Sequence, residues 1–261
     1  MDRRSFLVSL GAAAVAAGCR SAAESPGRFR VLTYNTHHGE GEDGRLDLGR
    51  IARVVRESGA DLVALQELDI RTRRTGGVDQ GAEYRRLIGF DGRFGRAIDF
   101  EGGHYGQMLL CRWPMEEPEV IALPNPSRRE QRIAMATRVR IPGGPVLRFV
   151  GLHLDATRDD GDRFLQARRL VELFGGEAGP TVLAGDFNDT PGSRVMRAFD
   201  GRWKDAAEGN PEPTNPAGTP RTRIDFVLHS GFRGWRVGRA LALPEAAASD
   251  HRPLLVEFVR A

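Results

Sequence analysis

The sequence predicts an α/β (α+β) fold built from two β-sheets that pack face to face, with helices on the outside. Three observations lead to this fold class. Short apolar runs with the patterning of strands outnumber the helical segments, and glycine and proline residues separate them. The helical segments fall between groups of strands, where they can cover the sheets. Each half of the chain begins with a strand–helix–strand pattern, and one domain is expected over residues 29–261.

The first half of the chain opens with the first strand–helix–strand unit. Phe29–Thr36 alternates apolar and polar residues and is expected to form a strand. The segment 46–59 carries apolar residues at helical spacing and ends in glycine, which predicts a helix. The stretch ADLVALQEL is a nearly continuous apolar run and indicates a buried strand that ends at Gln66–Glu67. A polar loop over residues 71–81 then leads to a short helix at Glu83–Ile88.

The remainder of the chain is rich in strands. Successive strands are expected at Phe94–Phe100, Tyr105–Arg112, Pro118–Leu123, Arg132–Ile141 and Pro145–Leu154. An amphipathic helix over residues 159–176 and a strand over residues 181–188 follow. A short helix near Ser193–Phe199 and a loop rich in Pro, Asn and Gly over residues 209–220 come next. The last strands are expected at Arg223–His229, Trp235–Leu243 and Leu254–Val259.

Composition and charge set broad bounds on function. The 261 residues are 40% hydrophobic and 28% charged, an ordinary globular composition that is long enough to bury a substantial core. The formal net charge is +3, and Lys204 is the single lysine, so nearly all of the positive charge is arginine. A guanidinium group matches phosphate oxygens well. The charge alone, however, does not indicate a nucleic-acid partner.

The N-terminal residues 1–18 are expected to be an export signal. They have a basic start and an apolar stretch that is too short and too rich in alanine to span a bilayer. The pair Arg3–Arg4 resembles a twin-arginine signal, and AAGC resembles a lipoprotein processing box. A lipidated Cys19 would then begin the mature chain, with residues 19–28 as its tether. The sequence thus predicts an exported protein of the cell envelope that is anchored to a membrane, with a mature charge of +2.

Polar side chains end or interrupt most of the predicted buried strands. They are Asn35, Gln66–Glu67, His153, Asp155, Asp186, Asn188, Asp225 and Ser249–Asp250–His251. Each alone has an ordinary structural explanation, such as a strand cap, a turn or a surface histidine. Asp225 is harder to dismiss, because a carboxylate inside an apolar strand needs a partner to offset its desolvation. Asp186 and Asn188 lie two apart on a backbone expected to be extended, so their side chains would point the same way.

The set is more informative than its members. Strand ends of a packed sheet converge at one rim. Carboxylate and carboxamide oxygens, without a cysteine pair or a His-x-x-x-His motif, describe a site for a hard cation such as Mg²⁺ or Mn²⁺. The histidines add groups that can exchange protons near neutral pH. Such a site suits the attack of water on a phosphorus ester.

The ordered motifs LTYNTHHG, ALQELD, LHLD, AGDFND, RIDFVL and SDHRP resemble the endonuclease/exonuclease/phosphatase superfamily of deoxyribonuclease I-like metal-dependent phosphohydrolases. The resemblance extends over residues 29–259. It implies a four-layered sandwich of two mixed β-sheets with helices outside. It also implies that Glu67, with Asn35 beside it, binds the divalent metal, and that Asp250 is a further metal or histidine-orienting ligand.

The resemblance assigns catalytic roles to the remaining residues. Asp186 would orient or activate the attacking water, with Asn188 holding that water or the phosphate. His251 would act in proton transfer or phosphate stabilisation, oriented by Asp225. His153 would contact the phosphate or serve as the complementary acid.

Arg132 falls where relatives often carry an arginine that can reach the phosphate. One segment departs from the family pattern. Many close relatives have Gly-Asn-Ala before an apolar run and then Ser-Arg, whereas this chain reads YGQMLLCR. Gln107 and Met108 replace the small amide and the alanine, so the contact that Gln107 makes is open. Cys111 replaces the serine and is expected to be a small buried hydrophobe without a disulfide partner.

The leading functional expectation is a Mg²⁺-dependent phosphodiesterase or phosphatase, monomeric, exported and lipid-anchored. Its substrate would be a phospholipid-derived or other small phosphoester. An exported nuclease of DNA or RNA is the alternative, although the low charge and the lack of a long basic or aromatic insertion do not favour it. A binding lipoprotein that kept the pocket and lost turnover is a third reading, against which the intact set of site residues argues.

Overall fold

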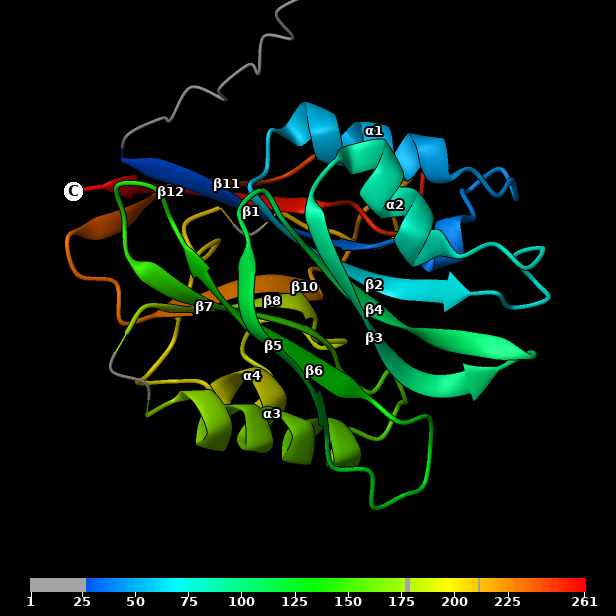
Figure 1. Cartoon of the computed structure of the whole chain (residues 1–261). Helices are drawn as coiled ribbons and strands as arrows, with labels where there is room; N and C mark the ends of the chain where they lie inside the picture. Colours follow the sequence, from blue (N-terminus) through cyan, green and yellow to red (C-terminus); the bar gives the residue numbers. More distant parts are fainter. Residues whose placement is uncertain (1–26, 177–178, 211) are drawn as a thin grey trace, which may run out of the picture.

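The computed structural model describes residues 27–176, 179–210 and 212–261, which form two six-stranded sheets packed face to face (Figure 1). The expected export signal, the lipidation site Cys19 and the first eight residues of the tether lie outside the described residues. The expected tether ends one residue early, because Arg28 already begins the first strand. In the described part of the chain, no helix is both long and apolar enough to cross a membrane.

The first sheet has the strand order β11-β12-β1-β2-β4-β3. Its strands are β1 (Arg28–Asn35), β2 (Leu62–Ile70), β3 (Asp91–Phe100), β4 (Gly103–Cys111), β11 (Trp235–Ala242) and β12 (Leu254–Arg260). The second sheet has the order β5-β6-β7-β8-β10-β9. Its strands are β5 (Met115–Ala122), β6 (Ile133–Arg140), β7 (Val146–His153), β8 (Thr181–Asp186), β9 (Lys204–Asp205) and β10 (Asp225–Ser230).

Helices cover the outer face of each sheet, which completes four layers (Figure 1). They are α1 (Leu48–Ser58) and α2 (Gln80–Ile88) on the first sheet, and α3 (Gly161–Phe174) and α4 (Arg194–Arg197) on the second. A 3-10 turn, η1 (His37–Gly39), follows β1. Both sheets are mixed, because β1–α1–β2 and β7–α3–β8 join parallel neighbours whereas the other strand pairs are antiparallel. The predicted fold class is confirmed.

Three apolar clusters fill the spaces between these layers, and the alternation of side chains along each strand assigns residues to them. In β1, Phe29 and Val31 point into the cluster between the sheets, whereas Leu32 and Tyr34 point to the helices α1 and α2. The same period of two places Cys111, which is wholly buried and free, in the inter-sheet cluster. The prediction of a buried Cys111 is therefore confirmed.

Most predicted elements agree with the structure within a few residues, and the differences that matter lie in β2, α2, β9 and β10. The strand expected to end at Gln66–Glu67 continues to Ile70 as β2. Helix α2 begins at Gln80, inside the expected loop, because the Asp79 side chain caps it by accepting from the Ala82 N–H. The two-residue strand β9 was not expected, and β10 begins at Asp225, so this aspartate starts its strand rather than interrupting it.

Gly185 in β8 leaves no room for a side chain beside the backbone of β7. A Cβ atom added at Gly185 would lie 2.1 Å from the Leu152 carbonyl oxygen, which is backbone and cannot move aside alone. Gly185→Ala is therefore expected to lower the free energy of unfolding by about 1–3 kcal/mol. Urea denaturation measures this loss, and Gly209→Ala is the matched control because nothing lies within 4 Å of its added Cβ. Equal midpoints for the two variants would contradict the packing argument.

His229 in β10 should make stability dependent on acidic pH. Burial and the charge of Lys204, opposed by Asp205, lower the pKa of His229 from its ordinary value of 6.5 to about 4. The unfolded chain therefore binds the proton first, so the stability from neutral His229 is complete above pH 6.5 and is lost as the pH falls through about 4. His229→Gln is expected to lose less stability than the parent between pH 7 and pH 4, measured by urea denaturation. His104→Gln, at a half-exposed site, is the control, and identical pH slopes for parent and His229→Gln would contradict the expectation.

Candidate active site

Four strands end at the same edge of the two packed sheets, which we call the opening between the sheets, and each of these ends carries a polar side chain. The alternation that buries Phe29 and Val31 between the sheets also points Asn35 there, at the end of β1. His153, Asp186 and Asp225 take the same face at the ends of β7, β8 and β10, in phase with apolar residues of the inter-sheet cluster. All four side chains are buried, with at most 6% of each residue exposed.

Strand register brings the three residues of the second sheet into one row. His153 pairs with Asp186 across the parallel β7–β8 ladder, and Asp225 pairs with Asp186 across the antiparallel β8–β10 ladder. Neighbouring strands lie about 4.8 Å apart, so this register alone places the three side chains side by side. The predicted convergence of these three residues is thus a result of sheet topology.

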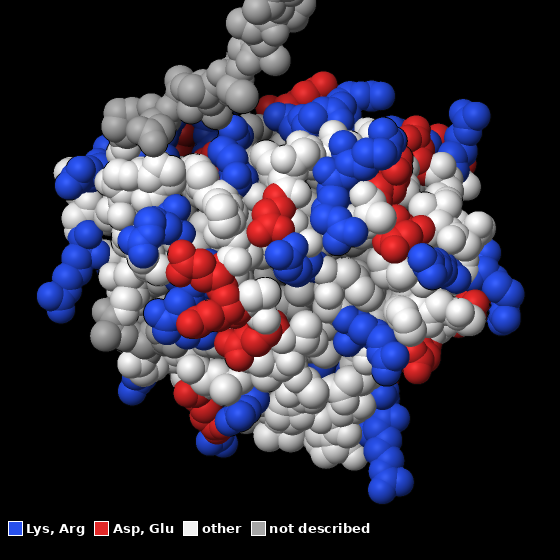
Figure 2. Space-filling view, in the orientation of Figure 1, with Lys and Arg blue, Asp and Glu red and all other residues white. Residues whose placement is uncertain are grey.

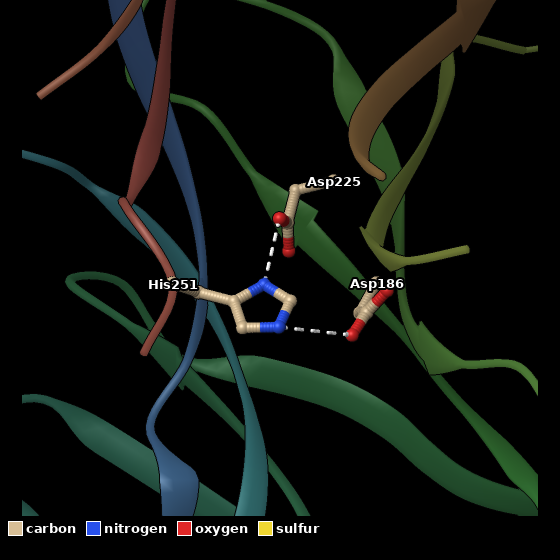
Figure 3. A group of neighbouring side chains, drawn as sticks. All are labelled: Asp186, Asp225 and His251. Atoms are coloured by element: carbon tan, nitrogen blue, oxygen red, sulfur yellow. Dashed lines mark hydrogen bonds and ion pairs between the residues drawn. The ribbon is translucent and has the colours of Figure 1, made fainter. Parts of the chain in front are cut away.

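His251 reaches the same place from the first sheet, through the loop that precedes β12 (Figure 3). Its Nδ1 donates to Asp225 Oδ2 at 2.9 Å, and its Nε2 lies 3.8 Å from Asp186 Oδ2. The imidazole therefore stands between two carboxylates that belong to the opposite sheet (Figure 3). The second oxygen of Asp225, Oδ1, is buried and has no hydrogen-bond partner among the described residues.

Ser249 fixes the loop that presents His251. Its hydroxyl donates to the Asn35 carbonyl at 2.7 Å and accepts from the His251 N–H at 3.3 Å. One buried hydroxyl thus ties the end of β1 to the loop before β12. The sequence assigned no role to Ser249, because a serine and an aspartate shortly before a proline are typical of an ordinary turn.

The pairing of charges explains the titration of the site. Burial opposes the charged form of His251, but the carboxylates of Asp225 and Asp186 outweigh it and raise the pKa of His251 well above its ordinary value. Burial and the charge of Asp225 raise the pKa of Asp186, although His251 and hydrogen bonds from Asn188 and Asn35 act in the opposite direction. The site therefore holds an imidazolium against an unusually basic carboxylate.

Glu67 enters the site because of a β-bulge in β2. The register with β4 shifts between Leu65 and Leu68, so two residues of β2 oppose only Gln107. Glu67 has a φ of 60°, in the left-handed region that side chains other than glycine rarely adopt. The bulge takes Glu67 out of the strict alternation, and its Oε1 accepts from Asn35 Nδ2 at 2.9 Å. A backbone held in this conformation beside a cluster of acids is typical of a functional position.

Asn35 links the two carboxylates of the site. Its Nδ2 donates to Glu67 Oε1 and also to Asp186 Oδ2, at 3.1 Å. The His37 N–H donates to Asn35 Oδ1 at 3.1 Å, which fixes the orientation of the amide. The Asn35 side chain thus bridges Glu67 of the first sheet and Asp186 of the second.

His153 is held as a neutral imidazole by Arg132. The Arg132 guanidinium has no acceptor, so its 3.1 Å contact with His153 Nδ1 requires an unprotonated Nδ1 and leaves the proton on Nε2. Burial, Arg132 and His251 together lower the pKa of His153 well below its ordinary value. His153 Nε2 lies 3.6 Å from Asp186 Oδ2. Arg132 thus reaches the site, where it contacts His153 and Glu130, and His153 is suited to donate a hydrogen bond rather than to act as an acid.

Asn188 and Asp250 lie beside the site in arrangements that differ from the sequence expectation. The backbone at Asn188 is not extended, because β8 ends at Asp186 and the φ of Asn188 is 51°. Its N–H donates to Asp186 Oδ1 at 2.8 Å, while its side-chain amide donates to the Leu154 carbonyl. Asp250 Oδ1 lies 3.3 Å from the Ser249 hydroxyl, and within the described residues no hydrogen bond or ion pair joins the Asp250 carboxylate to Glu67 or Asn35. Its role as a metal ligand stays a prediction.

Gln107, where the sequence departs from the family pattern, bridges the two sheets. Its Nε2 donates to the carbonyls of Ile133 and Gly151 at 3.2 and 3.1 Å, and both of these acceptors belong to the second sheet. A shorter amide would not reach as far. The contact of Gln107, which the sequence did not determine, is therefore with the opposite sheet. Gln107 also lines a small cavity together with Arg132 and His153.

The donor set of the site suits a hard divalent cation. Carboxylate oxygens of Glu67, Asp186 and Asp225 converge there, and Asp225 Oδ1 lacks a partner among the described residues. Asp186, Asp225 and His251 offer ligand atoms within 4.8 Å of one another. A cation in that group would compete with the positive charge of His251, so the Glu67–Asn35 side is the more favourable one.

Comparison with known proteins agrees with this architecture. The sequence profile of the Endonuclease/Exonuclease/phosphatase family matches residues 32–251. Uncharacterized protein YbhP of Escherichia coli is 28% identical over 250 residues, which cover 88% of this chain and 96% of YbhP.

Two solved structures share the fold. An endonuclease/exonuclease/phosphatase from Beutenbergia cavernae superposes with a TM-score of 0.75 at 24% identity, over 90% of this chain and 72% of that one. A mannosyl-6-phosphatase from Bacteroides thetaiotaomicron superposes with a TM-score of 0.72 at 22% identity, over 88% of this chain and 99% of that one.

Proposed function

Because the chain belongs to the endonuclease/exonuclease/phosphatase family of phosphoester hydrolases, we propose that it cleaves a P–O ester bond by in-line attack of water on phosphorus. One observation carries the proposal. A buried imidazolium from the first sheet, His251, faces two carboxylates from the second, Asp186 and Asp225, at the opening between the sheets. This arrangement places a proton donor directly beside a base, the pair that hydrolysis of a phosphoester by water needs.

Asp186 is the base that prepares the attacking water. Its Oδ1 accepts from the Asn188 N–H, whereas its Oδ2 accepts from Asn35 Nδ2 and lies beside Nε2 of both His153 and His251. The raised pKa of Asp186 makes this carboxylate a better proton acceptor than an ordinary aspartate. Asn188 therefore orients Asp186, and Asp186 takes the proton of the water as the new P–O bond forms.

His251 and His153 stabilise the phosphate. Asp225 holds the Nδ1–H of His251, so the Nε2–H of the imidazolium is directed to a phosphate oxygen and carries the proton for the leaving oxygen. Neutral His153 donates its own Nε2–H to a second oxygen, while Arg132 keeps it in that tautomer. Charge that develops on the phosphoryl oxygens is thus met by donors that are already in place.

A divalent cation, Mg²⁺ or Mn²⁺, would be held by Glu67 with Asn35 beside it, and Asp250 remains a candidate further ligand. When bound, such a cation supplies charge neutralisation at the phosphate. The positive φ of Glu67 and the hydrogen bonds of the Asn35 amide to both Glu67 and Asp186 hold the two carboxylates close to each other. A dianionic phosphate can approach this group of acids only if their negative charge is offset.

We further propose a substrate that is a small or phospholipid-derived phosphoester, and a chain that is exported and lipid-anchored at Cys19. The export motif and the processing box in the sequence support the location. A fold neighbour that is a mannosyl-6-phosphatase supports small esters as candidates. The low net charge gives little general attraction to a long polyanion.

A parallel assay tests these proposals. The full chain is expected to hydrolyse bis(p-nitrophenyl) phosphate when Mg²⁺ or Mn²⁺ is present and to lose this activity in EDTA. Plasmid DNA, RNA, sphingomyelin, inositol phosphates and mannose 6-phosphate are compared at two salt concentrations. Nucleic-acid cleavage that falls steeply with salt would replace the small-ester proposal with the nuclease. Failure to turn over any phosphoester with either metal would leave a binding protein.

A further inference from the structure

The strands that carry the site run through the molecule and end at a basic surface on the other side. β1, β8, β10 and β12 each have one end at the opening between the sheets, and their other ends are Arg28, Thr181, Ser230 and Arg260. The eight residues of β1 span about 23 Å at the rise of an extended strand. The first described residue, Gly27, lies at this far end, where its carbonyl accepts from the Arg260 N–H at 2.7 Å.

Exposed cations gather at this far end, which we call the basic pole. They are Arg140, Arg202, Lys204, Arg233, Arg236 and Arg260. None of the six forms an ion pair with any residue in the described ranges. The nearby acids are already paired, because Glu257 contacts Arg30 at 2.9 Å and Asp205 contacts Arg223. Figure 2 shows basic side chains along its left margin, the side on which β12 ends in Figure 1.

A pocket of 340 Å³ lies within the basic pole, between the ends of β9, β10 and β11. Arg202, Lys204 and Arg236 line it together with Phe232 and Trp235, and no acidic residue of the described chain does. Trp235 is half-buried, and its neighbour Phe232 stacks on Phe258 at 4.9 Å between ring centroids. Cations around a fixed aromatic residue combine electrostatic attraction with an amphipathic ring, the combination that suits a membrane interface.

We propose that the basic pole docks on the anionic headgroups of the membrane to which the chain is anchored, with Lys204, Arg236 and Trp235 at the contact. This inference rests on the proposed anchor at Cys19. Cys19 is eight residues before Gly27 in the sequence, so in an anchored chain Gly27, and with it the basic pole, lies within about 28 Å of the lipid surface. The cations without acidic partners then meet the negative charge of the bilayer.

Vesicle binding by full-length chains that carry Cys19→Ser tests the proposal without the covalent lipid. Vesicles of phosphatidylcholine with 30 mol% phosphatidylglycerol are compared with vesicles of phosphatidylcholine alone, by sedimentation at two salt concentrations. The pair K204Q/R236Q is expected to weaken binding to the anionic vesicles about 30-fold. The matched pair R53Q/R168Q, exposed cations on α1 and α3, is expected to change it less than threefold.

A second readout is local to Trp235 and is independent of the residues before Gly27. Brominated phosphatidylcholine in the anionic vesicles is expected to quench tryptophan emission of the bound chain, and Trp235→Phe is expected to remove most of that quenching. Equal binding by both charge pairs together with no quenching of Trp235 would overturn the proposal. So would loss of DNA binding by K204Q/R236Q with vesicle binding unchanged, since that result assigns the basic pole to nucleic acid. Hydrolysis of bis(p-nitrophenyl) phosphate is expected to be unchanged in K204Q/R236Q, so loss of catalysis and loss of docking are separate results.

Discussion

His251→Gln is expected to lower kcat for hydrolysis of bis(p-nitrophenyl) phosphate by about 10³-fold, the effect of removing a positioned proton donor. The reason lies in the two contacts of the imidazole. Nδ1–H is fixed on Asp225 at 2.9 Å, and Nε2 faces Asp186 at 3.8 Å, so one ring both neutralises the acids and presents a proton to the opening. Glutamine cannot carry that charge. Initial rates at saturating substrate measure the change in kcat.

Two controls separate catalysis from folding in that experiment. His104→Gln removes a half-exposed histidine that pairs with Asp99 at the surface, and it is expected to keep its kcat within a factor of about two. Circular dichroism and urea denaturation establish that His251→Gln is folded, because the Asp225–Asp186 pair loses its counter-charge in this variant. A folded His251→Gln with a kcat within tenfold of the parent would remove His251 from the mechanism.

Glu67→Gln is expected to abolish the response to divalent metal and to lower kcat/KM by at least about 10²-fold. Glu67 is the carboxylate that the bulge in β2 turns toward Asn35 and Asp186, so the substitution removes a charged oxygen and keeps the size of the side chain. The binding readout is thermal denaturation. The Tm of the parent should rise with added Mn²⁺ or Mg²⁺ by mass action, and the Tm of Glu67→Gln should not.

Glu57→Gln provides the matched control for this prediction, because Glu57 is exposed on α1, away from the opening between the sheets. It should retain both the metal-induced rise in Tm and full activity. If added metal raises the Tm of Glu67→Gln as much as that of the parent, the cation site is instead at Asp186 and Asp225. Ligand atoms of these two residues lie within 4.8 Å of each other and of His251. Asp225→Asn would then be the variant that loses it.

Much of this site follows from strand periodicity. Once Phe29 and Val31 are recognised as core residues of one face, a period of two places Asn35 on that face as well. The same reasoning applies to Asp186, which follows Val182 and Ala184 at even spacing in β8. Both strands end in polar side chains, and strand ends of packed sheets converge at one rim, so the sequence alone predicts that these side chains meet. The alternation of apolar residues along a strand is therefore enough to predict which acidic side chains at its end are buried.

Contacts that depend on irregular backbone could not be obtained in that way. The bulge that redirects Glu67 leaves the sequence pattern of β2 unchanged, so the strand was expected to end where it only bends. The left-handed conformation of Asn188 likewise converts a side chain expected to point with Asp186 into one that holds Asp186 through its backbone N–H. The hydroxyl of Ser249 joins segments 214 residues apart, and no local pattern reports such a contact.

If the chain docks on lipid through the basic pole as proposed, the opposite placement of the active site limits which phosphoesters it can reach. In a chain that contacts lipid through the basic pole, the active site faces away from the membrane. It lies about 23 Å above the headgroups, which is the length of β1. The active site cannot then reach a phosphodiester that is still part of a lipid in the same leaflet. Its substrates are then molecules that arrive by diffusion from the aqueous side. The membrane holds the protein in place and does not supply the substrate.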